Sequence, residues 1–440
     1  MLFSNGRYDD MNEIICTLNK DDAFSIESSA FHVNLLEKKD YHYTFFNKKR
    51  RLYQFPFFFS TEALDLFYIS LMVYYADRKV LRGDSYDAWT RRFKIYMPVL
   101  ELEKWNLNKV LLEKTLAFLS GDIWEFEFRK RNHNEVEKNF IKGFERTKKK
   151  HSPKAFCMLS GGLDSFIGAI DLLNDKKDIV FVSHYGGGKG EIQYQQKLKV
   201  QLKDKFKLNN NQFFNFYAVP LKGIEDTTRT RSFMFFAHAI ILVSGVGEEM
   251  SLYIPENGLI SLNIPLTNTR LGTSSTRTTH PHYMNKLQLL LDNLGISVEL
   301  KNPYQFFTKG EMIENCKSPS FLKDNINNTM SCSSPDQGRF NKETSPSHCG
   351  TCLPCIIRRA SIKKAYGADK SYYRDKDFKT PQAINELKSY KIGLLEFEND
   401  NPRFKIQESG PINSDFEKFE SLYKRGMVEL ASVINEYDEL

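Results

Sequence analysis

The sequence predicts an α/β protein built on a doubly wound parallel sheet, preceded by a mixed α/β domain and followed by helices. Three observations lead to this prediction. From Lys154 onward, short apolar runs alternate with amphipathic segments of helical length, which is typical of parallel sheets. The first run ends in a glycine-rich turn, and four cysteines with metal-type spacing lie between Cys332 and Cys355. The 440 residues also exceed what one hydrophobic core usually serves, so two or three domains are expected.

Residues 1–150 are expected to form the mixed α/β N-terminal domain, a candidate surface for docking a partner. Residues 61–78 have helical periodicity, residues 91–99 alternate as a strand does, and residues 107–122 again have helical periodicity. A basic stretch at residues 129–151 ends the domain. The domain holds all three tryptophans, which we interpret as core or interface anchors rather than catalytic groups: Trp89, Trp105 and Trp124.

Residues 151–370 are expected to form the sheet domain, and residues 371–440 a helical appendage with a structural role. Ligands of parallel sheets bind at the carboxyl ends of the strands, so the turns after these strands are the candidate site. In the appendage, residues 416–437 have the pattern of a charged helix. The sheet domain is predicted to have strands at residues 155–159, 179–185, 214–221 and 251–255, and helices at residues 165–173, 191–206 and 232–245.

The composition argues against a membrane enzyme. Hydrophobic residues make up 41% and charged residues 27% of the chain, and no apolar run approaches the roughly 20 residues that a membrane-spanning helix needs. The N-terminal residues lack the pattern of a secretion signal, so a cytoplasmic location is expected. The net charge of +7 is small for this length, so nucleic-acid binding is not favoured. Three scattered cysteines are interpreted as ordinary thiols: Cys16, Cys157 and Cys316.

The hexapeptide SGGLDS carries the clearest chemistry, because it lies between a predicted buried strand and a predicted helix. Its glycines let the backbone turn sharply and approach an anion, while the free amides at the helix start and the two hydroxyls donate to phosphate oxygens. The carboxylate of Asp164 can hold a magnesium ion beside those phosphates. The alternative is a serine-capped helix after a plain glycine turn. The hexapeptide consists of Ser160, Gly161, Gly162, Leu163, Asp164 and Ser165.

This hexapeptide resembles the SGGxDS signature of PP-loop ATP pyrophosphatases, matching it at each fixed position. The resemblance implies a HUP-like fold and an enzyme that cleaves ATP between the α and β phosphates, giving AMP and pyrophosphate. The signature differs from a Walker A loop, and the sequence GGGKG at residues 186–190 does not fit the Walker spacing either. We interpret GGGKG as a flexible loop.

Four cysteines predict a closed metal site. Cys349, Cys352 and Cys355 recur every third residue, and Cys332 lies upstream across a polar loop. Four thiolates leave no open position for water, so zinc there would hold a loop in place rather than activate a nucleophile. An iron–sulfur cluster, four free thiols or a redox pair are the alternatives, because spacing alone does not choose the metal. His348 is interpreted as a neighbour of the site and not as a ligand.

The order of the motifs narrows the resemblance. SGGLDS is followed by TKGEMI at Thr308–Ile313 and then by the cysteines, an order that resembles the QueC (7-cyano-7-deazaguanine synthase) enzymes over roughly residues 152–368. Tyr185 and Gly186 also resemble a YG pair of that family. The resemblance implies that ATP activates the carboxylate of 7-carboxy-7-deazaguanine as an acyl adenylate. Ammonia then converts the adenylate first to an amide and then to a nitrile.

Further residues enter the candidate site through this resemblance and through their places along the chain. Lys309 is the candidate cationic contact to phosphate, and a solvated lysine at a helix start is the alternative. Arg231 is expected to contact ATP and Arg229 the substrate, with two surface charges as an equal alternative. Glu256 and Asn257, in the turn IPENG, are expected to recognise a purine-like base edge, unless they form a plain turn.

Two features depart from a plain QueC enzyme. About 150 residues precede the resembling part, and the segment TNTRLGTSSTRTTHPHYM replaces the expected substrate-side pattern. Within that segment, His280 and His282 flank Pro281 at the start of a predicted helix, so we do not interpret them as metal or acid–base groups. The N-terminal run DRKVLRGDSYDAWTRRFKIYMPV resembles the QueC-like components of bacterial antiphage operons, especially QatC of the Qat system and the related component of type IV CBASS.

That branch implies transfer of the deazaguanine to the terminal amine of a partner protein encoded nearby. Three other functions stay open at this point. The chain can be a biosynthetic synthase that uses ammonia, or a PP-loop enzyme that modifies tRNA through its basic stretch. It can also be a nucleotide-binding scaffold without catalysis, although the intact SGGLDS motif argues against that function.

Overall fold

The structure is a computed structural model that describes residues 11–19, 21–27, 30–146, 150–264 and 277–437. The chain forms two compact units. The first unit comprises residues 1–153, 216–250 and 283–299, and the second comprises residues 154–215, 251–282 and 300–440. Each unit therefore contains segments that are far apart in the sequence. Within the described residues, no helix is long and apolar enough to cross a membrane.

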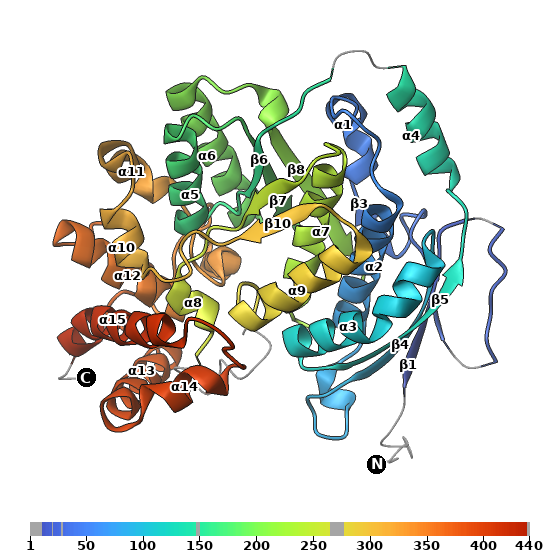
Figure 1. Cartoon of the computed structure of the whole chain (residues 1–440). Helices are drawn as coiled ribbons and strands as arrows, with labels where there is room; N and C mark the ends of the chain where they lie inside the picture. The colour runs from blue at the N-terminus through green and yellow to red at the C-terminus, as the bar shows by residue number, and fades with distance from the viewer. Residues whose placement is uncertain (1–10, 20, 28–29, 147–149, 265–276, 438–440) are drawn as a thin grey trace. The chain divides into compact units, whose positions relative to one another are not determined.

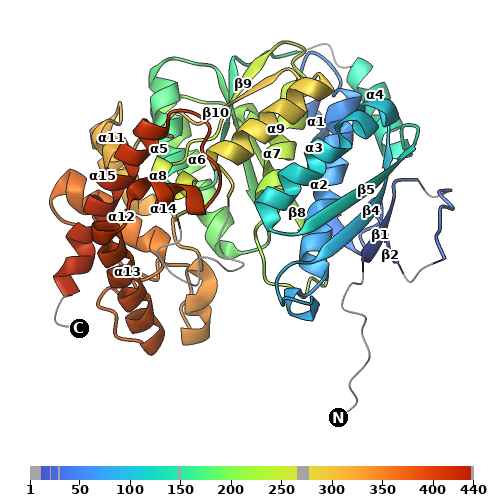
Figure 2. The same cartoon turned by 60° about the horizontal axis from the view of Figure 1, so that its bottom comes forward.

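The first unit contains a four-stranded sheet in which every neighbouring pair of strands is parallel. The predicted strand at residues 91–99 is confirmed as β4, whereas the first strand, β1, was not predicted from the sequence. Figure 2 shows α2 and α3 on one face of this sheet. The strand order is β2-β1-β4-β5, with β1 at Asn12–Thr17, β2 at Phe31–Asn34, β4 at Arg92–Val99 and β5 at Ile123–Lys130.

The predicted helices of this unit are confirmed as α2 (Thr61–Lys79) and α3 (Leu102–Ser120). The hydroxyl of Ser60 caps α2 by accepting from the amide of Ala63, and all side chains from Ala63 to Asp77 are buried. A helix that is apolar on most of its circumference belongs in a core, as α2 does. The other elements of this unit are β3 (Tyr41–Tyr43), α1 (Lys49–Leu52), α4 (Glu135–Glu145), α7 (Arg231–Ser244) and most of α9 (Pro281–Leu294).

The second sheet has six strands in the order β10-β9-β6-β7-β8-β3. Strand β6 pairs in parallel with both β7 and β9, while β3 pairs antiparallel with β8. The chain therefore continues from β6 to β7 on one side, and β9 is added later on the other side. Ligands of such sheets bind where the strand order reverses, which here is at the carboxyl ends of β6 and β9. The strands are β6 (Ala155–Met158), β7 (Ile179–Tyr185), β8 (Phe213–Pro220), β9 (Met250–Tyr253) and β10 (Val298–Lys301).

Buried apolar residues explain why the second unit adopts this arrangement. All four residues of β6 are buried, and Ala155 and Cys157 pack in one core with the inner faces of α5 (Leu163–Asn174) and α6 (Lys189–Phe206). These elements confirm the strands and helices predicted between residues 155 and 206. The parallel sheet of the predicted α/β class is thus present in the structure.

A helical C-terminal region was also predicted, and the structure confirms it (Figure 1). Helix α15 is amphipathic, with Leu422, Tyr423, Met427 and Leu430 buried at helical spacing. It contacts α8, α12, α13 and α14. The helices of this part of the second unit are α8 (Gly258–Leu262), α10 (Lys309–Glu314), α11 (Pro319–Asn325), α12 (Leu353–Tyr366), α13 (Pro381–Asn399), α14 (Pro402–Glu408) and α15 (Phe416–Ile434).

Candidate active site

The turn between β6 and α5 is built around two glycines. Gly161 has a φ of +97°, which side chains of L residues rarely adopt, and a Cβ there would lie 3.3 Å from the backbone nitrogen of Gln195. Gly162 is the N-cap of α5 and offers no side chain to cap it. No side chain of the N-cap residue therefore occupies the amides of the first turn of α5, and their binding of phosphate stays a prediction.

Hydroxyls inside the turn hold its shape. Ser160 Oγ accepts from the amide of Gly162 at 3.3 Å and donates to Ser165 Oγ at 3.1 Å. Ser165 Oγ in turn donates to the carbonyl oxygen of Gly162 at 3.0 Å. Gln195 of α6 also stabilises the turn, because its Nε2 donates to the carbonyl oxygen of Ser160 at 3.2 Å. Sequence reasoning missed Gln195, because a glutamine on a polar helix carries no signal of its own.

Asp164 is the centre of a buried cluster. Its Oδ1 lies 2.9 Å from Lys309 Nζ, and its Oδ2 accepts from the backbone amide and the side-chain amide of Asn257 at 3.0 and 2.7 Å. Asp164, Lys309 and Asn257 are each at most 5% exposed. They come from the first turns of α5 and α10 and from the cap of α8, so the fold unites three distant segments of the second unit.

The location of Lys309 differs from the alternative that the sequence left open. Lys309 is the first residue of α10, but it is 5% exposed and ion-paired rather than solvated. Asn257 is held as the turn alternative expects, and its recognition of a base edge stays a prediction. Its Oδ1 accepts from the amide of Ile260 at 3.1 Å as an ordinary helix cap, while its Nδ2 serves Asp164.

The pKa values of the two carboxyl groups in the cluster, Asp164 and Glu256, shift in opposite directions. Burial by itself would raise the pKa of Asp164, but the Lys309 ammonium and hydrogen bonds from Glu256 and Asn257 lower it below its usual range. Burial and the negative charge of Asp164 raise the pKa of Glu256 well above its usual range. The two pKa shifts therefore favour the ionised form at Asp164 and the neutral form at Glu256. The charge favoured at Asp164 lies in the first turn of α5 and is paired with Lys309.

The two predicted arginines lie in the first unit, whereas the Asp164 cluster lies in the second. Arg229 is 5% exposed and donates to the carbonyl oxygen of Ser120 at 3.1 Å, and its guanidinium lies 4.7 Å from the ring centroid of Trp89. Arg231 begins α7. Arg229 is thus buried rather than a surface charge, and the expected contacts of the two arginines with substrate and ATP stay predictions.

Two of the tryptophans and the lone cysteines fit their interpretation, whereas Trp89 is only half-buried. Trp105 is 0% and Trp124 3% exposed, as expected for core anchors. Burial raises the pKa of the lone thiols, which suits unreactive groups. These thiols belong to Cys16, Cys157 and Cys316.

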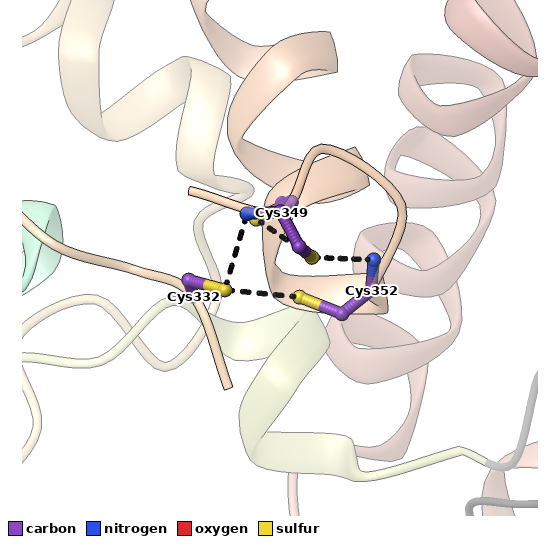
Figure 3. A group of neighbouring side chains, drawn as sticks. Cys332, Cys349 and Cys352 are labelled. Atoms are coloured by element: carbon purple, nitrogen blue, oxygen red, sulfur yellow. Dashed lines mark hydrogen bonds between the residues drawn. The ribbon is translucent and has the colours of Figure 1, made fainter. Parts of the chain in front are cut away.

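Four cysteine sulfurs converge in the second unit, and Figure 3 shows three of them. The Sγ atoms of Cys332, Cys349, Cys352 and Cys355 all lie within 4.8 Å of one another. Two of the separations are 3.8 Å (Cys349–Cys355) and 4.0 Å (Cys332–Cys352). A tetrahedral zinc ion with sulfurs at about 2.3 Å would place them about 3.8 Å apart. The donor set therefore fits one metal ion.

The surroundings of the cluster also suit bound thiolates. The amides of Ser334 and Cys349 donate to Cys332 Sγ, both at 3.4 Å, and such donors stabilise negative sulfur. His348 Nε2 accepts from the amide of Ser331 at 3.2 Å. His348 Nε2 is thus bonded to the backbone, which agrees with the interpretation of His348 as a neighbour of the metal site and not as a ligand.

The segment GGGKG differs from the expected flexible loop. Helix α6 begins at Lys189, and the amide of Gly190 donates to Asp336 Oδ1 at 3.0 Å. A carboxylate at a helix start is stabilised by the helix dipole, which orders this end of the segment.

The segment that departs from the expected substrate-side pattern lies partly outside the described residues, which omit 265–276. In its described part, Pro281 begins α9 as predicted. His280 is 0% exposed, and its Nδ1 accepts from the amide of His282 at 3.2 Å. The described part therefore supports the structural interpretation of His280.

Comparison with known proteins gives a distant similarity. Two 7-cyano-7-deazaguanine synthases of Leptospira interrogans serogroup Icterohaemorrhagiae, from serovars copenhageni and Lai, are each 23% identical to this chain over 243 residues. The aligned part is 89% of each synthase and 49% of this chain. No family model matches the chain. The similarity supports a QueC-like chain, and about half of the chain has no counterpart in these relatives.

Proposed function

We propose that this chain is an ATP-using enzyme that adenylates a 7-deazaguanine carboxylate and transfers the acyl group to an amine. One observation carries the proposal. The buried group of Asp164, Lys309 and Asn257 lies at the free N-terminus of α5, at the strand-order reversal of a parallel sheet. The distant similarity to 7-cyano-7-deazaguanine synthases supports the nature of the substrate.

The first step makes the acyl adenylate. A carboxylate oxygen of the substrate attacks the α phosphorus of ATP, the bond from that phosphorus to the bridging oxygen breaks, and pyrophosphate leaves. The amides at the start of α5 and the Lys309 ammonium stabilise the charge that grows on the pyrophosphate. Magnesium would be held by the Asp164 carboxylate and would neutralise phosphate charge.

The second step releases AMP as an amine attacks the activated carbonyl carbon. It depends on holding the two reactants together and excluding water. We propose that the amine is the N-terminus of a partner protein and that the reaction serves bacterial antiphage defence. The resemblance of the N-terminal run to antiphage components supports this, as does the half of the chain without a counterpart in the synthases.

The four cysteines are proposed to hold a structural zinc ion. Four protein sulfurs complete a tetrahedral shell, so this site has no position for a reacting water molecule. The mutual distances of the sulfurs, all within 4.8 Å, favour a single ion over a larger iron–sulfur cluster.

Pyrophosphate exchange tests the first step. Purified full-length chain is incubated with ATP, magnesium, labelled pyrophosphate and 7-carboxy-7-deazaguanine, with Asp164→Ala as the control. We expect label to enter ATP only when both the carboxylate substrate and Asp164 are present. A scaffold without catalysis would show no exchange, and exchange that instead requires tRNA would favour the tRNA-modifying alternative.

Intact-protein mass spectrometry tests the acceptor. The same mixture is supplied with each protein encoded beside this chain, and in parallel with ammonia. A deazaguanine-sized mass gain on one neighbour, absent with Asp164→Ala, is the expected result. Efficient formation of the free amide or nitrile from ammonia, with no protein adduct, would contradict the proposed acceptor and favour the biosynthetic alternative.

A further inference from the structure

The turn that carries Lys309 needs contacts from other parts of the chain to hold its position. Helix α10 has six residues, and an isolated helix of that length is unstable in water. Its start is closed by a capping box in which Thr308 N donates to Glu311 Oε2 at 2.9 Å and Glu311 N donates to Thr308 Oγ1 at 3.2 Å. This box shapes the turn locally, but other contacts must decide where the turn lies.

Glu429 of α15 supplies contacts on both sides of Lys309. Its Oε2 accepts from Thr308 Oγ1 at 2.7 Å, and its Oε1 accepts from the amide of Gly310 at 3.0 Å. Glu429 is 7% exposed. One carboxylate from the C-terminal region thus holds the residues before and after the candidate phosphate-contacting lysine.

Arg425, one helical turn earlier on α15, holds the same segment at its two ends. Its Nε donates to Glu311 Oε1 at 2.7 Å, and its Nη2 donates to the carbonyl oxygen of Phe306 at 2.7 Å. Residues 306–311 are therefore attached to α15 through two side chains and four partners. All of these residues belong to the second unit.

The carboxylate of Glu429 lies close against the backbone of Gly310. A Cβ on Gly310 would lie 2.6 Å from Glu429 Oε2, so only glycine lets the carboxylate approach the backbone this closely. Burying a carboxylate is costly unless donors surround it. Here the donors are Thr308 and Gly310, with Lys364 Nζ at 3.5 Å. An apolar residue would give the same helix packing without that cost, so packing alone does not account for a glutamate here.

We infer that Glu429 and Arg425 are positioning residues of the active site, and that α15 fixes Lys309 against Asp164. This inference rests on the proposed function, because it assigns the C-terminal helical region a part in ATP chemistry. Neither residue touches Asp164; both act through the segment at residues 306–311.

A double-mutant cycle tests the inference by pyrophosphate exchange, with kcat and the KM for ATP measured separately. Glu429→Ala is expected to lower kcat roughly 10- to 100-fold, because it releases the turn that places Lys309. Glu429→Gln keeps an acceptor for the amide of Gly310 and is expected to recover part of the rate. In the Lys309→Met background, Glu429→Ala should cost little more, because its effect passes through Lys309.

Glu420→Gln is the matched control on the same helix, because Glu420 bonds Arg403 and Lys424 rather than the segment at residues 306–311. It should leave kcat unchanged. The inference would be overturned if the losses of kcat from Glu429→Ala and Lys309→Met were additive. Equal losses of kcat from Glu420→Gln and Glu429→Ala would also overturn it. If Glu429→Ala does not fold, Arg425→Leu replaces it in the same cycle.

A second readout separates this inference from the proposed function. Hydrogen exchange at the amide of Gly310 should accelerate in Glu429→Ala and not in Glu420→Gln, whether or not the enzyme exchanges pyrophosphate. Wild-type protein that shows no pyrophosphate exchange would therefore contradict the proposed function alone. Unchanged protection of the segment at residues 306–311 would contradict the positioning by α15 alone.

Discussion

The backbone amide of Met330 donates a 2.9 Å hydrogen bond to the carbonyl oxygen of Gly161. Met330 lies two residues before Cys332, the first cysteine of the cluster. Arg358 of α12 supports the same segment by donating to Thr329 Oγ1 at 2.7 Å. The metal site and the glycine-rich turn are therefore joined through three consecutive residues, Met330, Ser331 and Cys332.

Loss of the metal is thus expected to weaken ATP binding as well as stability. Cys352→Ser removes one of four ligands, so metal content measured by plasma mass spectrometry should fall and ATP affinity should fall with it. Cys316→Ala, a buried cysteine outside the cluster, is the control and should keep the metal. Visible absorbance of iron and sulfide in the wild-type protein would contradict the assignment of zinc.

Gly161→Ala is expected to lower ATP affinity. The left-handed backbone at Gly161 costs about 1–3 kcal/mol with a side chain, and the added Cβ also presses on Gln195. Gly295→Ala is the matched control, because Gly295 has a φ of +75° but nothing within 4 Å of an added Cβ. Calorimetric titration with ATP should show a loss for the first variant and none for the second; equal affinities would argue against phosphate binding at this turn.

Asn257→Ala tests whether this residue serves Asp164 or the substrate. The variant removes the 2.7 Å bond to Asp164 Oδ2, and we expect kcat for pyrophosphate exchange to fall roughly 10- to 100-fold. Asn174→Ala, at the far end of α5, is the control. A rise in the KM for 7-carboxy-7-deazaguanine at unchanged kcat would instead support the recognition of a base edge by Asn257.

His280 is expected to make stability depend on pH in the acidic range. Burial lowers the pKa of His280 to about 3 from an ordinary value of 6.5, so the folded protein keeps it neutral while the unfolded chain takes up a proton. Its contribution is fully present above pH 6.5 and is lost as the pH falls towards 3, by about 2 kcal/mol at pH 5. Urea unfolding at pH 7 and pH 5 measures this loss.

His280→Gln should reduce that dependence, because the variant has no imidazole at this position to protonate in the unfolded chain, while His238, whose pKa burial lowers to about 4, keeps its own contribution. His32→Gln, at an exposed position of β2, serves as the control variant. An unchanged difference between the two pH values in His280→Gln would show that other groups control the acid sensitivity.

The local patterns in the sequence were sufficient for the α/β class, for many of the individual elements and for the two motifs. SGGLDS and the cysteines are recognisable because a sharp phosphate-binding turn and a closed metal shell each require particular residues at particular spacings. Strands β6, β7, β8 and β9 of the second sheet are recognisable because they are largely apolar runs between turns, whereas β3 and β10 were not predicted. Strand β1 was not predicted from the sequence, although Ile14, Ile15 and Cys16 are all buried.

The tertiary structure alone decided which candidate residues meet. Asn257 and Lys309 lie 93 and 145 positions after Asp164 in the sequence. They meet because the buried carboxylate of Asp164 needs donors from both. The same need places Glu429 beside the turn of Lys309, and Arg229 lies over the ring of Trp89 from a distant segment. The sequence by itself determined the elements and motifs, because these depend on neighbours along the chain. The partners of each buried polar group depend on which distant segments fold together, and local sequence carries no record of that.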